Sequence, residues 1–396
     1  MQKLNGTIAS AGLAGLAAAI LGASGAFAAD VKLPSNISWT AYGTTSSGYA
    51  QSIGIGQMLA KKYNSSLRVI PGKNDVSRMV PLREGQSPLC ACGIAAYFAQ
   101  EGVLMFATKK WGPMRIYNVL NNIGDNGQQG MVAGDAGIKS IKDIKGKRVT
   151  WVKGAPALNI NMTAFLAFAG LTWDDVQKVV VPGWKQSAEA VLNGQADVTW
   201  GSTVSSAYNQ IAASPRGIYW VSLPHGDKEA WARANAIAPH WSPAMVKLGV
   251  DIKKNESGKV PHTGMNYPYP IFVATAEAPN DLTYGLTKAV MENYEDIKDS
   301  GPSMGGYQLS RQNLKWIFPY HPGAIAYYKE KGVWTAEHDK HNAMLLKRQD
   351  VLADAWKAYE SANSSKGDDE FTAGWIKARA AALDKAGMPV PFRNAE

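Results

Sequence analysis

Two stretches of the chain repeat the same order of elements, and this repetition limits the fold more than any other feature of the sequence. In the first stretch we predict apolar strands at residues 37–41, 67–70 and 89–94, each followed by a loop and a helical segment. In the second, strands at residues 148–152 and 179–181 are followed by helices in the same way. This alternation is typical of mostly parallel sheets with helices on their faces. The sequence therefore predicts an α/β fold built from two units of one layout.

The chain returns to the first unit after completing the second. Residues 266–270 contain two prolines, which keep the residues before them out of the helical region, and we interpret this segment as the crossing. Two lobes joined by crossing strands leave a cleft between them. The predicted parts are a signal peptide at residues 1–28, lobe I at 29–129, lobe II at 130–265, the second part of lobe I at 266–334, and a helical C-terminal extension at 335–396.

The N-terminus has the features of a secretory signal peptide. Lys3 precedes an apolar run at residues 8–21, and the small residues Ala26 and Ala28 predict cleavage before Ala29. The run is too short and too rich in glycine to span a bilayer stably, so a retained anchor is the weaker alternative. No cysteine follows the cleavage point, which argues against a lipid anchor. We therefore expect a soluble periplasmic protein, and a monomer.

Charge and cysteine content restrict the function further. The formal net charge is +9, but the basic residues are scattered, so we do not expect nucleic acid as a partner. Cys90 and Cys92 are the only cysteines. A lone C-x-C lacks the further ligands of a metal site, and two strand residues at this spacing lie near the upper limit for bridging. We therefore predict two small buried side chains rather than a disulfide.

The sequence contains none of the common catalytic or cofactor motifs. A nucleophile elbow, a phosphate-binding loop and a dinucleotide-binding glycine pattern are all absent. The six histidines are dispersed, and we interpret His338 and His341 as surface residues rather than metal ligands. We predict no catalytic residue, no metal and no cofactor.

A hydroxyl-rich junction at residues 42–49 is the clearest candidate binding segment. It lies between a strand and a helix, and it places four consecutive hydroxyls before a helix N-terminus whose free N–H groups can bind a carboxylate. An ordinary helix cap is the alternative, although a cap needs only one hydroxyl. Loops beyond other strand ends meet the same requirement. The residues predicted to bind ligand are Thr44, Thr45, Ser46, Ser47, Tyr49, Asn74, Gly93, Asn159, Trp184, Ser202 and Thr203.

Four segments in a fixed order are specific enough to indicate a family. They are residues 43–49, 141–149, 169–176 and, most specific, 319–332, which read PYHPGAIAYYKEKG. In this order they resemble the TAXI-type periplasmic solute-binding proteins of TRAP transporters. The resemblance covers about residues 37–334. It implies a two-lobed periplasmic binding protein fold of type II with a hinged cleft, which captures a small organic acid and delivers it to membrane permease subunits driven by an ion gradient.

Two departures from the family pattern indicate a less polar ligand. Residues 155–158 replace a hydroxyl-rich loop of lobe II, and residues 92–94 replace a polar run of lobe I. Trp184 or Trp200 could cover an apolar part of a ligand with a flat ring. We therefore expect a monocarboxylate, or an aromatic or otherwise apolar acid, rather than glutamate.

Two other functions remain open at this point. A binding protein of an ABC importer for sulfonate-like ligands would share the fold but not the membrane partner, and neighbouring genes for an ATPase or for a fused permease would separate the two. A secreted enzyme has only a cleft in its favour, and it would need an ionisable pair converging in that cleft.

Overall fold

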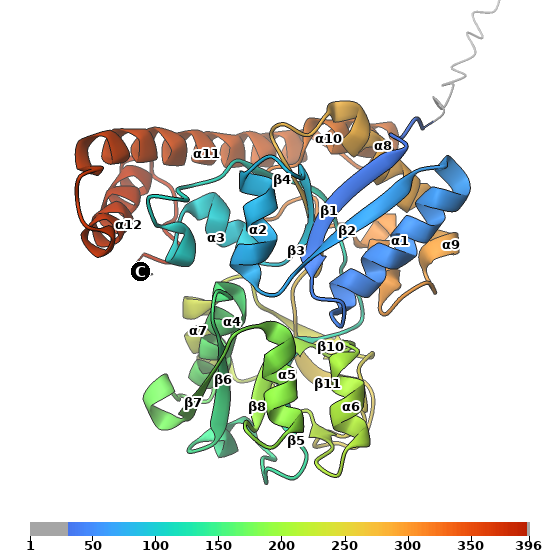
Figure 1. Cartoon of the computed structure of the whole chain (residues 1–396), viewed down its shortest axis with the longest axis vertical. Helices are drawn as coiled ribbons and strands as arrows, with labels where there is room; N and C mark the ends of the chain where they lie inside the picture. Colours follow the sequence, from blue (N-terminus) through green and yellow to red (C-terminus); the bar gives the residue numbers. More distant parts are fainter. Residues whose placement is uncertain (1–30, 394–396) are drawn as a thin grey trace, which may run out of the picture. The chain divides into compact units, whose positions relative to one another are not determined.

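The computed structural model describes residues 31–393, so the predicted signal peptide lies outside the described residues. Within this range the chain forms two five-stranded sheets flanked by helices, and two further helices follow at the C-terminus (Figure 1). We refer to the two sheets with their helices as lobe I and lobe II. The two-lobed α/β fold expected from the repeated pattern is confirmed.

The sheet of lobe I has the strand order β2-β1-β3-β12-β4. Strand β1 pairs in parallel with β2 and β3, and β12 runs antiparallel to β3 and β4, so four of the five strands share one direction. The returning strand β12 comes from a distant part of the chain, after lobe II is complete. The strands are β1 (Asn36–Tyr42), β2 (Ser66–Gly72), β3 (Leu89–Cys92), β4 (Ile116–Asn121) and β12 (Ile271–Thr275).

The sheet of lobe II repeats this plan with the order β7-β6-β8-β5-β9. Strand β6 is parallel to β7 and β8, and β5 is the antiparallel strand beside β8 and β9. A two-stranded antiparallel ribbon, β10-β11, completes the lobe. The strands are β5 (Gln128–Ala133), β6 (Arg148–Val152), β7 (Gln177–Val181), β8 (Val198–Ser202), β9 (Ile218–Tyr219), β10 (Ser242–Val246) and β11 (His262–Asn266).

Helices cover both sheets, and most of them begin where a strand ends. Lobe I carries α1 (Ser47–Tyr63), α2 (Asp75–Arg83), α3 (Ala95–Glu101), α8 (Asn280–Glu292), α9 (Tyr294–Ile297) and α10 (Pro322–Glu330). Lobe II carries α4 (Pro156–Phe168), α5 (Trp184–Leu192), α6 (Ala207–Ala213) and α7 (Lys228–Ile237). The sequence analysis predicted no elements for residues 204–265, where α6, α7, β10 and β11 lie. None of the helices among the described residues is long and apolar enough to cross a membrane.

The C-terminal extension is anchored to lobe I by buried charges. It consists of α11 (Ala336–Asn363), which runs along lobe I, and α12 (Asp368–Lys385), which folds back (Figure 1). Glu101 at the end of α3 accepts hydrogen bonds from Arg348 Nε at 2.7 Å and Nη2 at 2.6 Å, and from Arg379. Trp375 Nε1 also donates to the carbonyl of Gly102 at 2.6 Å. The extension is therefore an integral part of lobe I rather than a loose tail.

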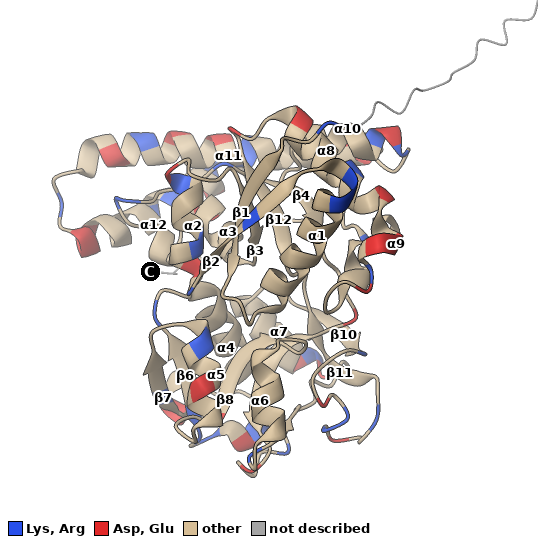
Figure 2. Ribbon diagram, turned by 45° about the vertical axis from the view of Figure 1, so that its right-hand side comes forward, with Lys and Arg blue, Asp and Glu red and all other residues tan. Residues whose placement is uncertain are grey.

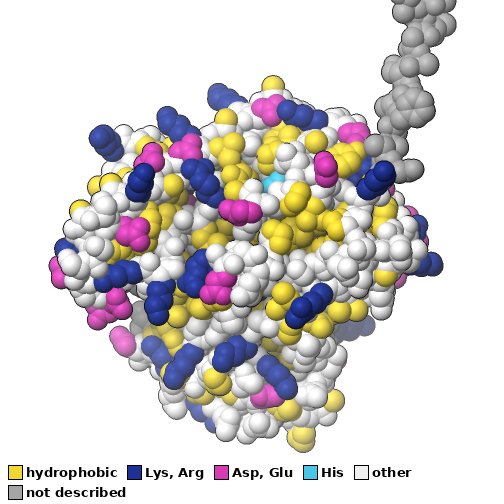
Figure 3. All heavy atoms as spheres, turned by 45° about the horizontal axis from the view of Figure 1, so that its top comes forward, with side chains coloured by type: hydrophobic (Ala, Val, Ile, Leu, Met, Phe, Trp, Pro, Cys, Tyr) yellow, Lys and Arg dark blue, Asp and Glu magenta, His cyan; other side chains and the backbone are white. Residues whose placement is uncertain are grey.

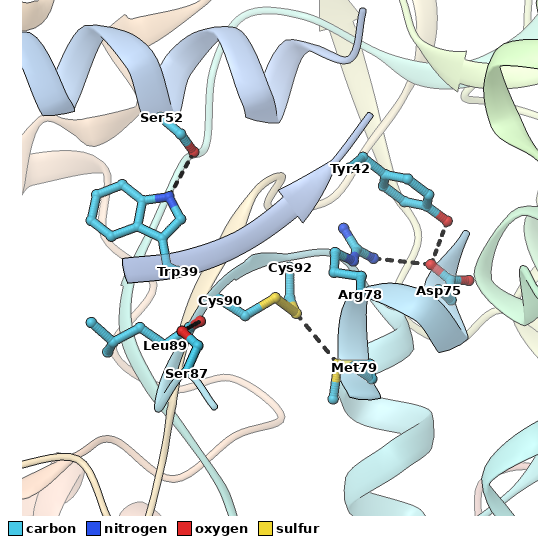
Figure 4. Close-up of a disulfide and its surroundings, with 10 residues drawn as sticks. All are labelled: Trp39, Tyr42, Ser52, Asp75, Arg78, Met79, Ser87, Leu89, Cys90 and Cys92. Atoms are coloured by element: carbon cyan, nitrogen blue, oxygen red, sulfur yellow. Dashed lines mark hydrogen bonds and ion pairs between the residues drawn. A yellow bond between two sulfur atoms is a disulfide. The ribbon is translucent and has the colours of Figure 1, made fainter. Parts of the chain in front are cut away.

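Cys90 and Cys92 form a disulfide, so our prediction of two unbridged cysteines was wrong (Figure 4). Their Cα atoms are 5.1 Å apart. Two residues at this spacing in a fully extended strand would be about 6.6 Å apart. The backbone at Ala91 is therefore contracted, which brings the cysteines within bridging range. The spacing of residues along the sequence cannot reveal such a local contraction.

Charged side chains of both signs are dispersed over the surface. Figure 2 shows Lys and Arg interspersed with Asp and Glu on the helices and loops of both lobes. The face seen in Figure 3 likewise alternates basic, acidic and apolar side chains without a block of one charge. The described residues contain no group of three or more His, Cys, Asp or Glu side chains that could hold a metal ion.

Candidate functional site

A small cavity lies between the two lobes, where strand ends and helix N-termini from both sheets meet. The space left in it is about 30 Å³, which is room for about two water molecules. Its walls come from strands, helices and crossing segments that are far apart in the sequence. The lining residues are Tyr42, Ser46, Arg78, Gly93, Ile94, Gln128, Ala157, Leu158, Trp184, Trp200, Gly201, Ser202, Ser205, Tyr267 and Tyr269.

Arg78 is the only basic side chain in this lining. It lies on α2, and its side chain and that of Asp75 are both 0% exposed, with Arg78 Nη2 2.9 Å from Asp75 Oδ1. The guanidinium also lies over the ring of Tyr42, 4.0 Å from the centroid, a favourable position for a cation (Figure 4). Arg78 Nε and Nη1 have no hydrogen-bond partner among the residues that the structure describes. Two donor nitrogens of a buried cation are therefore free to bind an acceptor.

Asp75 connects the two lobes. Its Oδ1 atom accepts from Arg78 and from the hydroxyl of Tyr42, and its Oδ2 atom accepts from the backbone N–H of Ala157, at the start of α4 in lobe II, at 2.7 Å. Burial raises the pKa of Asp75, while Arg78, Tyr42 and the Ala157 N–H favour the ionised form. Burial also raises the pKa of Tyr42 well above its usual value, so the phenol stays neutral and donates. The result is a buried carboxylate held by donors from both lobes.

The loops beside Asp75 dock the lobes against each other. Asn74 Nδ2 donates to the carbonyl of Lys153 at 3.1 Å, and the Val76 N–H donates to that of Gly154 at 3.1 Å. The Trp184 N–H, at the start of α5, donates to the carbonyl of Lys73 at 3.1 Å. The structure therefore describes a closed arrangement, and a molecule larger than the remaining space could enter only if the lobes separated.

Aromatic rings and unpaired donors make up most of the remaining wall. Trp184 Nε1 donates to the carbonyl of Trp200 at 3.2 Å, and Trp200 stacks on Trp241 with ring centroids 5.3 Å apart. Burial raises the pKa of both Tyr267 and Tyr269, so neither ring carries charge near neutral pH. Like Nε and Nη1 of Arg78, the donors Trp200 Nε1 and Gln128 Nε2 have no hydrogen-bond partner among the described residues. The excess of donors and the flat apolar walls suit an anion with an apolar body.

Four of the predicted binding residues lie in the cavity, and seven do not. Ser46, which also caps α1, lines it together with Gly93, Trp184 and Ser202. Thr44 is exposed and Thr45 and Ser47 lie outside the lining, while Tyr49 packs against the core of lobe I. Three others use their side chains for bonds within the protein: Asn74 caps α2 and bonds Lys153, Asn159 bonds the backbone of Val152, and Thr203 bonds Gly127 and Leu248.

Asp75 and Arg78 are the main residues that the sequence analysis missed. Neither residue is among the predicted ligand-binding residues. A signal was nevertheless present, because Asp75, Arg78, Met79 and Leu82 follow the i, i+3, i+4, i+7 spacing of one helix face and all four are buried. Two residues of opposite charge on such a face indicate a buried ion pair.

Two buried histidines of lobe II predict how stability depends on pH. Burial lowers the pKa of His240 to about 3 and that of His262 to about 4, whereas a histidine in the unfolded chain has an ordinary pKa of about 6.5. Below pH 6.5 the unfolded chain binds protons that the folded chain does not. We therefore expect the free energy of unfolding to fall by about 1.4 kcal/mol per pH unit for each histidine until the folded pKa is reached. Urea titrations between pH 7 and 4.5 measure this slope.

Replacing both histidines with glutamine should flatten that pH dependence. Glutamine at position 240 can still donate to Asn161 Oδ1, as His240 Nε2 does at 2.9 Å. A slope unchanged in the double variant would show that other groups cause the acid sensitivity.

One family model and several solved structures are similar to this chain. A family model described as the NMT1-like family matches residues 40–332. Similar solved structures include the alkanesulfonate-binding protein SsuA from Xanthomonas axonopodis pv. citri bound to MOPS, at 14% identity over 82% of this chain and 93% of that one, with a TM-score of 0.39. The periplasmic aliphatic sulphonate binding protein SsuA from Escherichia coli is 15% identical over 80% and 88% of the two chains, with a TM-score of 0.39. Likenesses this distant say nothing about the ligand of this chain.

Proposed function

The chain belongs to the NMT1-like family, which corresponds to the TAXI-type periplasmic binding proteins of TRAP transporters, and from this premise we propose that it captures a small organic acid between its lobes and delivers it to a TRAP-type permease. Proteins of this kind bind solutes for a transporter and are not enzymes. The resemblance carried by the four sequence segments is thereby confirmed at the level of the family. The ligand, the ion-gradient-driven permease and the periplasmic location are our proposals.

One observation supports an acidic ligand above all others. Arg78 is fully buried, lines the cavity, and has two donor nitrogens without a partner among the described residues. A buried donor without an acceptor costs about 1–3 kcal/mol, and more when it is charged. A carboxylate in the cavity would remove this cost and would bind both lobes at once. Ligand binding would then stabilise the closed state through its greater affinity for that state.

The walls of the cavity favour an acid with an apolar body. Trp184 and Trp200 come from lobe II, and Tyr42 and Tyr269 lie near Arg78. Flat rings offer apolar surface without competing charges. We propose a monocarboxylate, or an aromatic or otherwise apolar acid, as the ligand class. Calorimetric titration with acetate, butyrate, benzoate and glutamate tests this class, and tightest binding by glutamate would contradict it.

A single added methyl group at Gly93 should weaken binding. A Cβ atom there would lie 3.2 Å from Tyr269 Cε2 and 3.4 Å from Arg78 Nη2. The Tyr269 ring would have to move by a few tenths of an ångström, and if this shift of the wall costs the ligand one charge-assisted hydrogen bond, its affinity falls by about tenfold. Gly43→Ala is the matched control, because a Cβ at that position meets nothing within 4 Å. Equal affinities of the two variants would remove Gly93 from the site.

The permease partner can be tested by reconstitution. Proteoliposomes containing the permease subunits encoded beside this gene should accumulate labelled acid only when both this protein and an ion gradient are present. Uptake that needs ATP instead of a gradient would identify an ABC importer and contradict this part of the proposal.

A further inference from the structure

The N-terminus of α4 is bound by a carboxylate that belongs to the protein itself. Helix N-termini bind anions because their first N–H groups lack partners within the helix. The first residue of α4, Pro156, has no N–H, and the second, Ala157, donates to Asp75 Oδ2 at 2.7 Å. Asp75 of lobe I therefore accepts from the N–H of Ala157 in lobe II. Without Asp75, this N–H could donate to a ligand instead.

Asp75 occupies this position through its Oδ2 atom. Its other oxygen, Oδ1, already accepts from Arg78 at 2.9 Å and from Tyr42, and the side chain is 0% exposed. A second carboxylate approaching α4 would meet the negative charge of Asp75 at short range in a buried setting, where like charges repel strongly. The remaining donors, Nε and Nη1, belong to Arg78, which lines a cavity of only about 30 Å³.

We propose that Asp75 is a specificity-determining residue that occupies the carboxylate position at the N-terminus of α4, so that the cavity accepts acids with one carboxylate and excludes those with two. This inference rests on the proposed function, in which the cavity binds a small organic acid. Removing the Asp75 side chain should create a second anion position between Arg78, Tyr42 and the N–H of Ala157. The ligand range of the protein would then extend to dicarboxylates.

Chemical rescue by formate tests whether the position binds a free carboxylate. In Asp75→Ala, formate should raise the unfolding midpoint by about 2 °C more than the same concentration of chloride, since a ligand at ten times its Kd adds about 1.4 kcal/mol. Asp75→Asn is the matched control, because its side chain fills the space and should leave no room for formate. An equal formate response in Asp75→Ala, Asp75→Asn and the unaltered protein would overturn the proposal.

A second measurement begins with the unaltered protein, so its first result does not depend on the folding of a variant. The unaltered protein should bind butyrate at least about tenfold more tightly than succinate, and Asp75→Ala should reduce or reverse this ratio, because one charged hydrogen bond changes affinity by about that factor. Succinate binding as tightly as butyrate to the unaltered protein would overturn the role of Asp75 while leaving the acid-binding function intact. Absence of binding by every acid would instead count against the proposed function, and formate rescue would still decide the role of Asp75.

Discussion

Replacing Arg78 with alanine is expected to lower the affinity for the organic acid by at least about 100-fold, because two hydrogen bonds from a charged donor are lost together. The same change leaves Asp75 buried without its positive partner, so a loss of stability of about 3–5 kcal/mol should accompany it. Isothermal titration well below the unfolding midpoint of the variant separates the two effects.

Arg83→Ala is the matched control for this experiment. Arg83 lies on the same helix, its side chain is 29% exposed, and it pairs with Glu84 outside the cavity. Its removal should leave the affinity unchanged. If Arg78→Ala bound the acid as tightly as Arg83→Ala, the carboxylate could not be bound by Arg78.

Glu101→Gln is expected to be among the most destabilising substitutions in the chain. Glu101 is 0% exposed and is the carboxylate partner of both Arg348 and Arg379, whose side chains are 8% and 0% exposed. Glutamine keeps the size of the side chain but leaves two buried cations without a counter-charge. Loss of one partner of a buried ion pair costs about 3–5 kcal/mol, and urea unfolding measures it.

A surface glutamate provides the comparison. Glu370, in the first turn of α12, pairs with Lys366 just before the helix, and its side chain is 65% exposed. Glu370→Gln should change stability by no more than about 0.5 kcal/mol. Similar losses in both variants would mean that the extension is not held to lobe I by its buried charges.

The sheets were predictable because their signal is local. β1 and β6 are short apolar runs, and each was expected within about one residue of its observed bounds. The elements of residues 204–265 are different, since β10 and β11 pair only with each other. Both strands contain polar residues, and β10 is largely exposed. Such a ribbon depends on its packing against the rest of lobe II. The strand propensities of its residues carry no information about that packing.

The site was less predictable because its parts come together only in the folded chain. Tyr42, Arg78, Gln128, Ala157 and Tyr269 belong to five separate segments and meet at one cavity. Polar side chains near the strand ends were the clue that the sequence offered. Two of them, Asn159 and Thr203, bond backbone groups of the protein and do not line the cavity. Of residues 155–158, Ala157 and Leu158 line the cavity. The N–H of Ala157 donates to Asp75, which is 82 residues away in the sequence.

Our central proposal is that the buried Arg78 captures an organic acid. Mass spectrometry of the small molecules bound to the purified protein tests it most directly. The unaltered protein, purified from its native cells and denatured, should release one small organic acid with a single carboxylate in near-stoichiometric amount. The same preparation of Arg78→Ala should release none. Release of no acid from the unaltered protein, or of equal amounts from both, would contradict the account.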